Sequence, residues 1–472
     1  MLASPVIRAG PPVRFAAAVG AAVALSLPAS AFARDWRGPI DAPRVAIQGG
    51  HAAGPASYDR LWVRKYGPKD PRCVMVAVPG SPAGQGGFGW IAHAIAARVP
   101  RLAVWAVDRR PNAFEDVSAF KSGTPSQALG YYLGGQPFDG KQFQPVQPDQ
   151  AGFVRKWGAS VALRDLRHVI RGARAGGRRC VILTGHSFGA LMVPSYAAWD
   201  FSGHPGFRSI DAMVLIDGGM FNAFGTLLPQ SGFPPFKSVG QARRRIDALQ
   251  TQTPFGSDES MPGVPEWLTG VVPEVVCRFA LARPNAPSTL QAEGLDSFLP
   301  HPPSFPVTNA GFAGLFDNQV LADQGARLGQ LAASGSPRSW DDGPRASVRR
   351  FCATFTQEPG NGLEWYFPIR LEIDLAQGMQ SMVPTPITRF LGLRPFHLQQ
   401  IDVPLYAIET RLSHGKVLRA AHKLIDRSRI SDYRLVRADR MKHYDPLMSL
   451  PRHNRFLHTV VPFLRGVVRK HS

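Results

Sequence analysis

One stretch of the sequence limits the fold more than any other. At residues 181–190 a short apolar run ends abruptly in Gly-His-Ser-Phe-Gly, and a segment with a helical pattern follows at 190–199. This order predicts a strand, a sharp turn and a helix. Gly185 and Gly189 suit such a turn, because the backbone at Ser187 is strained and the flanking strand and helix approach closely. Ser187 would then present its hydroxyl at the carboxyl edge of a parallel sheet.

Apolar runs alternate with helix-like segments on both sides of this stretch. Continuous apolar runs are typical of parallel strands that are covered on both faces. Such runs lie at 73–78, 102–107 and 212–217, helical spacing is found at 88–99 and 161–173, and shorter candidate edge strands lie at 44–47 and 61–66. The alternation predicts a mostly parallel sheet with helices on both faces.

The strand, turn and helix around Ser187 resemble the nucleophile elbow of the α/β-hydrolase family. The resemblance covers about residues 60–219 and 400–470. It implies the α/β-hydrolase fold, a mostly parallel sheet covered by helices on both faces, and it implies that Ser187 is a catalytic nucleophile. An ordinary tight turn between a strand and a helix is the structural alternative.

A serine hydroxyl is a poor nucleophile near neutral pH and needs an adjacent base. His443 lies in the loop after the final expected strand, shortly before a closing helix expected at 456–468. The family that the chain resembles places its base there, and the order of serine first and histidine last agrees. We expect His443 to be the base, with a surface loop histidine as the alternative. His186 is expected to pack behind the elbow, because adjacent side chains on a tight turn diverge.

The acid of the predicted triad is less clearly marked. The resemblance implies an Asp in the loop after the strand expected at 403–409, but residues 410–415 contain no carboxylate. Two substitutes remain, Asp217 at the end of the preceding strand and Glu409 at the end of the later one. We favour Asp217, because some lipases and dehalogenases of this fold use that position. The structural alternatives are that Asp217 caps a turn and that Glu409 pairs with an arginine.

A glycine-rich loop, Pro-Gly-Ser-Pro-Ala-Gly-Gln-Gly-Gly at 79–87, follows the strand at 73–78. Backbone N–H groups at such a position can bind an anion, and the resemblance implies that the loop and Phe188 together form an oxyanion hole. Because Pro-Gly stands where many lipases have His-Gly-Gly, either Gly80 or Ser81 could be the donor. The loop lacks the lysine of a phosphate-binding loop. A simple turn is the alternative.

The alternating pattern stops at 220–400, where Pro- and Phe-rich pieces occur with helix-like stretches at 265–282 and 318–334. We predict one large lid or cap insertion, between a first core part at 34–219 and a final core part at 401–472. An independent second domain is the alternative, but no linker-like segment separates it.

Residues 113–157, which are rich in Gly, Gln, Pro and aromatic residues, are expected to form a loop over one edge of the site. The apolar composition of the insertion suggests that the substrate is a hydrophobic, small-molecule or lipid-like ester.

The first 33 residues have the layout of a secretory signal peptide. Arg8 and Arg14 precede an apolar segment at 15–27, and Ala-Phe-Ala at 31–33 provides small residues for cleavage near Ala33. The apolar segment is too short to span a membrane, and no other segment reaches the ~18 apolar residues that a span needs. We expect an exported protein, periplasmic or secreted.

Four cysteines, an even number, are expected to be paired in an oxidising compartment. Cys73 and Cys180 each begin an apolar run that ends in a predicted site loop. The resemblance to the hydrolase sheet implies that these runs are neighbouring strands in equal register, with the two sulfurs side by side. That arrangement leaves Cys277 with Cys352 inside the insertion. Four reduced, buried cysteines are the alternative.

The net charge of +20 could indicate a nucleic-acid partner. However, the arginines are scattered, and no recognition helix or aromatic-stacking motif accompanies them, so we expect no such partner and at most a weak attraction to anionic envelope surfaces. Neither metal-ligand spacing nor a nucleotide-binding fingerprint occurs, and we expect no metal and no cofactor.

The sequence therefore predicts an exported serine hydrolase that cleaves carboxylic esters through an acyl-enzyme. One alternative is an acyltransferase that acts on an envelope component and shares the covalent step. Another is a non-catalytic binding protein on the same fold. The missing conventional acid favours the binding protein, whereas the joint presence of Ser187, His443 and the glycine-rich loop opposes it.

Overall fold

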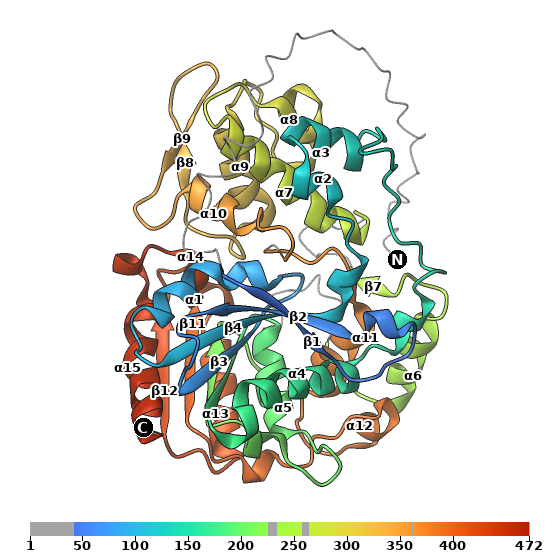
Figure 1. Cartoon of the computed structure of the whole chain (residues 1–472), viewed down its shortest axis with the longest axis vertical. Coiled ribbons are helices and arrows are strands. Elements are labelled where there is room, and N and C mark those ends of the chain that lie inside the picture. Colours follow the sequence, from blue (N-terminus) through green and yellow to red (C-terminus); the bar gives the residue numbers. More distant parts are fainter. Residues whose placement is uncertain (1–41, 225–233, 257–263, 361, 472) are drawn as a thin grey trace, which may run out of the picture. The chain divides into compact units, whose positions relative to one another are not determined.

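The computed structural model describes residues 42–224, 234–256, 264–360 and 362–471; the expected signal peptide lies outside them. A sheet of eight strands, in the order β1-β2-β4-β3-β5-β6-β11-β12, forms the centre (Figure 1). The strands are β1 (Arg44–Gln48), β2 (Arg60–Tyr66), β3 (Cys73–Val78), β4 (Leu102–Asp108), β5 (Cys180–His186), β6 (Ala212–Ile216), β11 (Leu405–Thr410) and β12 (Tyr433–Ala438). β2 runs antiparallel to both of its neighbours and the other pairings are parallel. The predicted mostly parallel sheet is thus confirmed.

Helices cover both faces of the sheet, as predicted. One face packs against α4 (Ala159–Arg174), α5 (Gly189–Ala198) and α13 (Lys416–Asp426), and the other against α1 (Gly89–Ala96) and α15 (Arg455–Lys470). Successive residues of β3 serve opposite faces, as strand geometry requires. Val74 and Val76 pack on the first face, whereas Met75 and Ala77 pack on the second. Burial on both faces explains why the runs are continuously apolar.

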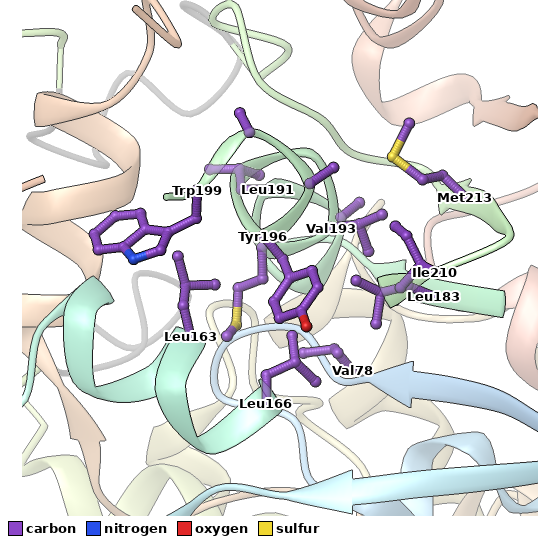
Figure 2. Packing of buried hydrophobic residues seen from close by; sticks show 14 of the residues in the cluster. Val78, Leu163, Leu166, Leu183, Leu191, Val193, Tyr196, Trp199, Ile210 and Met213 are labelled. Atoms are coloured by element: carbon purple, nitrogen blue, oxygen red, sulfur yellow. The ribbon is translucent and has the colours of Figure 1, made fainter. Parts of the chain in front are cut away.

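The helix after the Gly-His-Ser-Phe-Gly turn, α5, is buried along its whole length. Figure 2 shows Leu191, Val193 and Tyr196 of α5 within the same core as Leu163 and Leu166 of α4. A helix that is apolar on all sides is stable only inside such a core. The turn at the start of α5 is therefore held by a helix that has little freedom to move.

A second group of helices packs around its own apolar core, which we call the cap. Its members are α2 (Ser118–Ser122), α3 (Pro125–Tyr132), α7 (Glu266–Ala282), α8 (Thr289–Ala292), α9 (Asn309–Phe316) and α10 (Val348–Thr354), with side chains of residues 363–366. Helices α2 and α3 lie beside α7 (Figure 1) and come from the region 113–157. That region was expected to be a loop, and residues 133–151 do lack helices, but α2 and α3 are ordered by aromatic side chains such as Phe120 and Tyr132 that are buried in the cap core.

The helix expected at 318–334 is wrong. The helical segment begins earlier, as α9, continues as one π-helical stretch at Asp317–Leu321, and ends at Ala322. Ala322 has a φ of 48°, which an α-helix cannot contain. Residues beyond it form β8 (Gly329–Leu331), which pairs with β9 (Trp340–Asp342).

Part of the segment between β6 and β11 packs with the sheet and not with the cap. Phe367, Leu371, Leu391 and Ile401 belong to the same core as α4 and α5. The segment also contains α6 (Val239–Ala248), β7 (Phe255–Gly256), β10 (Phe367–Pro368), α11 (Ile369–Glu372) and α12 (Pro386–Leu391). Among the described residues, no helix is long and apolar enough to cross a membrane.

Both disulfides that the resemblance implied are formed. Cys73 and Cys180 are register partners on β3 and β5, with their Cα atoms 4.5 Å apart. Cys277 of α7 is bonded to Cys352 of α10, with their Cα atoms 4.7 Å apart. One disulfide therefore ties together two strands of the sheet, and the other ties together two helices of the cap.

Candidate active site

Ser187 lies in the sharp turn between β5 and α5, with a φ of 54°. A positive φ is uncommon for residues other than glycine and marks a strained backbone. The turn leaves no room for side chains around it: a Cβ on Gly185 would lie 2.1 Å from the Gly189 oxygen, and a Cβ on Gly189 would lie 2.2 Å from the Val78 oxygen. This is the elbow geometry that the sequence predicted, and it directs Ser187 to the carboxyl edge of the sheet.

His443 and Asp217 are brought together by two different strand ends. Asp217 directly follows β6, and His443 lies in the loop after β12. The distance from His443 Nδ1 to Asp217 Oδ2 is 2.6 Å, and both side chains are buried. The Asp217 carboxylate also accepts hydrogen bonds from the backbone N–H and the hydroxyl of Thr410. With Asp217 at Nδ1, the imidazole keeps Nε2 free to take a proton.

Glu409, the alternative acid, is held elsewhere. Its carboxylate accepts hydrogen bonds from the backbone N–H groups of Gly415 (2.6 Å) and Leu418 (2.8 Å) at the start of α13. Carboxylates are favourable at this end of a helix. Consecutive residues of a strand point to opposite faces, so that Thr410 reaches Asp217 while Glu409 points away from it. The structure therefore pairs Asp217, and not Glu409, with His443.

Ser187 and His443 line one small cavity of about 40 Å³, which holds on the order of three water molecules. Within the described part of the chain, no hydrogen bond joins the Ser187 hydroxyl to His443; the bonds of His443 run to Asp217, His186 and Asp323. Such a contact is often long in an enzyme without substrate and tightens when the substrate binds.

The backbone N–H groups of Gly80, Ser81 and Phe188 form no hydrogen bond to any residue that the structure describes. Gly80 lies against the elbow, since a Cβ at this position would be 2.9 Å from Ser187 Cβ and 3.5 Å from Ser187 Oγ. Gly80 and Ser81 also line the cavity. The predicted oxyanion donors thus have no hydrogen-bond partner among the described residues and lie close to the predicted nucleophile, as binding of a developing oxyanion requires.

His186 was expected to pack behind the elbow, but it lies at the cavity that Ser187 and His443 line, and it contacts His443. Its Nε2 lies 3.0 Å from the His443 carbonyl oxygen, and the two rings are in tilted contact with their centroids 4.4 Å apart. Burial, together with the neighbouring His443, lowers the pKa of His186 well below its usual value. A neutral imidazole therefore supports the loop that carries His443, a contact that the sequence did not indicate.

The outer walls of the cavity come mainly from the cap. Thr269 and Pro273 belong to α7, Phe355 directly follows α10, and Leu321 and Leu363 complete the apolar lining. Gln324 and Tyr444 contribute the remaining polar surface. No Asp, Glu, Lys or Arg side chain of the described residues lines this cavity. The described lining therefore offers no charged side chain that could pair with an ionic group.

The cap also holds the loop that carries His443. The N–H of His443 donates to the Asp323 carbonyl oxygen at 3.0 Å, and the N–H of Tyr444 donates to the Gly325 carbonyl oxygen at 3.0 Å. Sequence reasoning missed these contacts because residues 322–326 carry no motif. Thr410, which positions Asp217, was missed for the same reason.

Residues that could hold a metal ion are not gathered anywhere in the described parts of the chain: no group of three or more His, Cys, Asp or Glu side chains is suitably placed. The groups that the described residues place at or behind the cavity include a hydroxyl, an imidazole, a carboxylate and backbone N–H groups.

The eight-stranded sheet, its two covered faces and the strained serine turn together define the α/β-hydrolase fold. No protein-family model and no curated protein matches the sequence.

Solved structures with a similar fold include a protein from Sulfolobus solfataricus assigned as a lipase, with 14% sequence identity, a TM-score of 0.48 and coverage of 90% of this chain and 93% of that one. A thermophilic esterase from Thermogutta terrifontis has 10% identity, a TM-score of 0.39 and coverage of 90% and 99%. Epoxide hydrolase A from Mycobacterium thermoresistibile has 16% identity, a TM-score of 0.42 and coverage of 90% and 99%. These likenesses concern the fold alone.

Proposed function

We propose that this protein is a serine hydrolase that cleaves carboxylic esters, with Ser187 as nucleophile, His443 as base and Asp217 as acid. The observation that carries the proposal is the buried 2.6 Å contact between His443 Nδ1 and Asp217 Oδ2, because it orients the imidazole in the cavity that Ser187 lines. A base oriented by a carboxylate beside a strained serine is the arrangement that activates a hydroxyl.

The reaction proceeds in two halves. His443 Nε2 takes the proton of Ser187 as its oxygen attacks the ester carbonyl, and the resulting imidazolium, stabilised by Asp217, gives the proton to the leaving alcohol. Water then attacks the acyl-enzyme with His443 again as base, which releases the carboxylic acid and restores Ser187. The N–H of Phe188, together with that of Gly80 or Ser81, stabilises the oxyanion in both halves. Removal of one such donor typically lowers turnover by about a hundredfold or more.

The cavity supports a substrate whose acyl group is short and uncharged. A volume of about 40 Å³ accommodates an acetyl or propionyl group more readily than a long chain. Its walls are largely apolar and carry no formal charge within the described residues. This refines the hydrophobic ester that the sequence predicted toward a small acyl part, with the cap covering the carbonyl.

Export of the protein is part of the proposal. Two disulfides are typical of an oxidising compartment such as the periplasm or the exterior of the cell. The layout of residues 1–33 supports the same conclusion.

A fluorophosphonate probe tests the proposed function directly. Labelling of the purified protein, followed by mass analysis of the intact chain and of its peptides, should find one modification at Ser187 that is absent in Ser187→Ala and His443→Ala. Hydrolysis of 4-nitrophenyl acetate should disappear in the same variants. A folded protein that is neither labelled nor active, even with detergent present, would contradict the proposal. Product formation that depends on an added alcohol acceptor would instead indicate an acyltransferase.

A further inference from the structure

The buried side chain of Arg109 binds the glycine-rich loop. This residue directly follows β4, and its side chain is only 7% exposed. Its guanidinium donates hydrogen bonds to the carbonyl oxygens of Pro79 (2.9 Å), Gly80 and Ala83 (2.9 Å). One side chain thus binds three carbonyl groups of the loop that contains two of the predicted oxyanion donors.

Glu364 holds Arg109 from the side of the cap. Its fully buried carboxylate accepts hydrogen bonds from Arg109 Nε (2.9 Å) and from the Arg109 backbone N–H (3.3 Å). Residues 255 positions apart in the sequence are therefore joined in a buried ion pair. The carboxylate holds the Nε edge of the guanidinium, so that its terminal N–H groups are directed at the loop.

The same cap segment pairs with the loop through the backbone. The N–H of Gly84 donates to the Gly362 oxygen (2.9 Å), and the N–H of Glu364 donates to the Pro82 oxygen (2.6 Å). Ala83 and Leu363 form an antiparallel bridge between these two bonds. The loop is consequently held between Arg109 on one side and a short strand-like piece of the cap on the other.

Because the peptide unit is planar, a hydrogen bond that fixes its C=O also fixes the direction of its N–H. In a trans peptide unit, the C=O of one residue and the N–H of the next point in opposite directions. Arg109 binds the C=O of Pro79 and of Gly80, and these units carry the N–H groups of Gly80 and Ser81. Both N–H groups are uncommitted among the described residues, and Gly80 touches the elbow. Arg109 therefore binds the carbonyl ends of the two peptide units whose N–H groups are the candidate oxyanion donors.

We propose that Arg109 is a positioning residue that, braced by Glu364 of the cap, fixes the direction of the oxyanion-binding N–H groups at Gly80 and Ser81. This inference rests on the serine hydrolase function proposed above. Arg109 acts through the loop and does not touch the substrate. Its loss should therefore lower the turnover number far more than it changes the Michaelis constant, because the N–H groups act on charge that exists only in the transition state.

Two variants and one matched control test this role. Arg109→Lys keeps the charge but cannot reach three carbonyl groups, and it should lower kcat for 4-nitrophenyl acetate by about tenfold to a hundredfold with KM within about threefold. The double variant Arg109→Met with Glu364→Gln removes both buried charges together, which protects the fold, and it should lose as much kcat. Labelling of Ser187 by the fluorophosphonate should slow in parallel.

Arg110→Lys is the control. Arg110 is the next residue, is buried to a similar degree and binds Asp59, Asp165 and the Gly50 carbonyl oxygen, none of which lines the cavity. This variant should lower the melting temperature while kcat stays within about twofold of the wild type. A loss of kcat as large as that of Arg109→Lys would mean that general destabilisation explains both, and the positioning role would be wrong.

The outcomes separate the two proposals. A wild type that is neither labelled at Ser187 nor active would overturn the hydrolase function and the role of Arg109 with it. A labelled, active wild type whose Arg109→Lys and double variants turn over at the normal rate would overturn only the role of Arg109. If the double variant does not fold, Glu364→Gln takes its place, and normal kcat in both single variants overturns the proposal equally.

Discussion

Asp217 Oδ2 lies 2.6 Å from His443 Nδ1, although 226 positions separate the two residues in the sequence. The carboxylate stands at the end of β6 and not in the loop after β11, where the resemblance first implied it. Thr410, at the end of β11, uses its backbone N–H and its hydroxyl to hold that carboxylate in place. The strand that would ordinarily carry the acid thus contributes a residue that orients it.

Asp217→Asn should abolish most of the activity while Glu409→Gln should not. Asparagine cannot stabilise the imidazolium and favours the wrong imidazole tautomer, so kcat should fall by about a thousandfold to ten-thousandfold. Glu409 accepts two backbone hydrogen bonds away from the cavity, of which glutamine can keep only one, so Glu409→Gln should lower stability while kcat stays within about threefold of the wild type. Steady-state hydrolysis of 4-nitrophenyl acetate measures both. Equal losses would refute the assignment of the acid.

Gly80→Ala should disturb the site and Gly87→Ala should not. A Cβ at position 80 would lie 2.9 Å from Ser187 Cβ, so that either the loop or the elbow must move. A shift of this kind should lower kcat by about ten- to a hundredfold. A Cβ at Gly87, in the same loop, would meet nothing closer than 3.8 Å. Normal kcat in Gly80→Ala, measured beside the Gly87 variant, would contradict the proposed geometry.

Phe355→Ala should enlarge the acyl side of the cavity. Phe355 is one of the wall residues, whereas Phe351, whose ring makes an edge-to-face contact with it at 4.6 Å between centroids, does not line the cavity. The ratio of kcat/KM for 4-nitrophenyl butyrate to that for the acetate should rise about tenfold or more, since each methylene accommodated is worth about 1–3 kcal/mol. Phe351→Ala should lower stability without changing this ratio. An unchanged ratio in Phe355→Ala would show that the acyl group lies elsewhere.

Asp317 should make the stability of the protein depend on pH. Its carboxyl is fully buried, Oδ1 accepts a hydrogen bond from the Ala326 N–H, and Oδ2 has no partner among the described residues. Burial raises the pKa of Asp317 to about 7, against the opposing effect of Lys442. The folded protein therefore keeps a proton that the unfolded chain releases near pH 4, and this contribution to stability is lost as the pH rises toward 7.

Asp317→Asn keeps the hydrogen bond and removes the titration. The difference in unfolding free energy between variant and wild type should shift in favour of the variant by up to about 4 kcal/mol between pH 4 and pH 8. Urea unfolding at the two pH values measures it. A difference that does not change with pH would mean that Asp317 is ionised in the folded protein.

The parts of the fold that the sequence predicts well are those in which local pattern and burial agree. This holds for β3, β4 and β5, whose continuous apolar runs match strands that are buried along their whole length, and for the glycines around Ser187. The pairing of Cys73 with Cys180, which the resemblance implied, agrees with the register of β3 and β5. The cap is different. Helices α2 and α3 are ordered by aromatic contacts with distant residues, which no local pattern contains.

The choice between Asp217 and Glu409 as the acid shows why the site was only partly predictable. β11 is buried on both faces, so its sequence carries no alternation that tells which residues face Asp217. A shift of one position exchanges Glu409 for Thr410. Arg109 was missed for another reason, because its partner in the cap lies 255 positions away. The charged residues at the end of the apolar strand β4 were the one local signal for it.

The cap forms hydrogen bonds with two loops of the site, the loop that carries His443 and the glycine-rich loop. Residues 323–325 accept bonds from the loop that carries His443, and residues 362–364 pair with the glycine-rich loop. Replacement of the cap by a short linker would remove the hydrogen bonds that hold both of these loops. For the proposed hydrolase, a change of ester preference is therefore expected from exchange of side chains that line the cavity while the cap is retained.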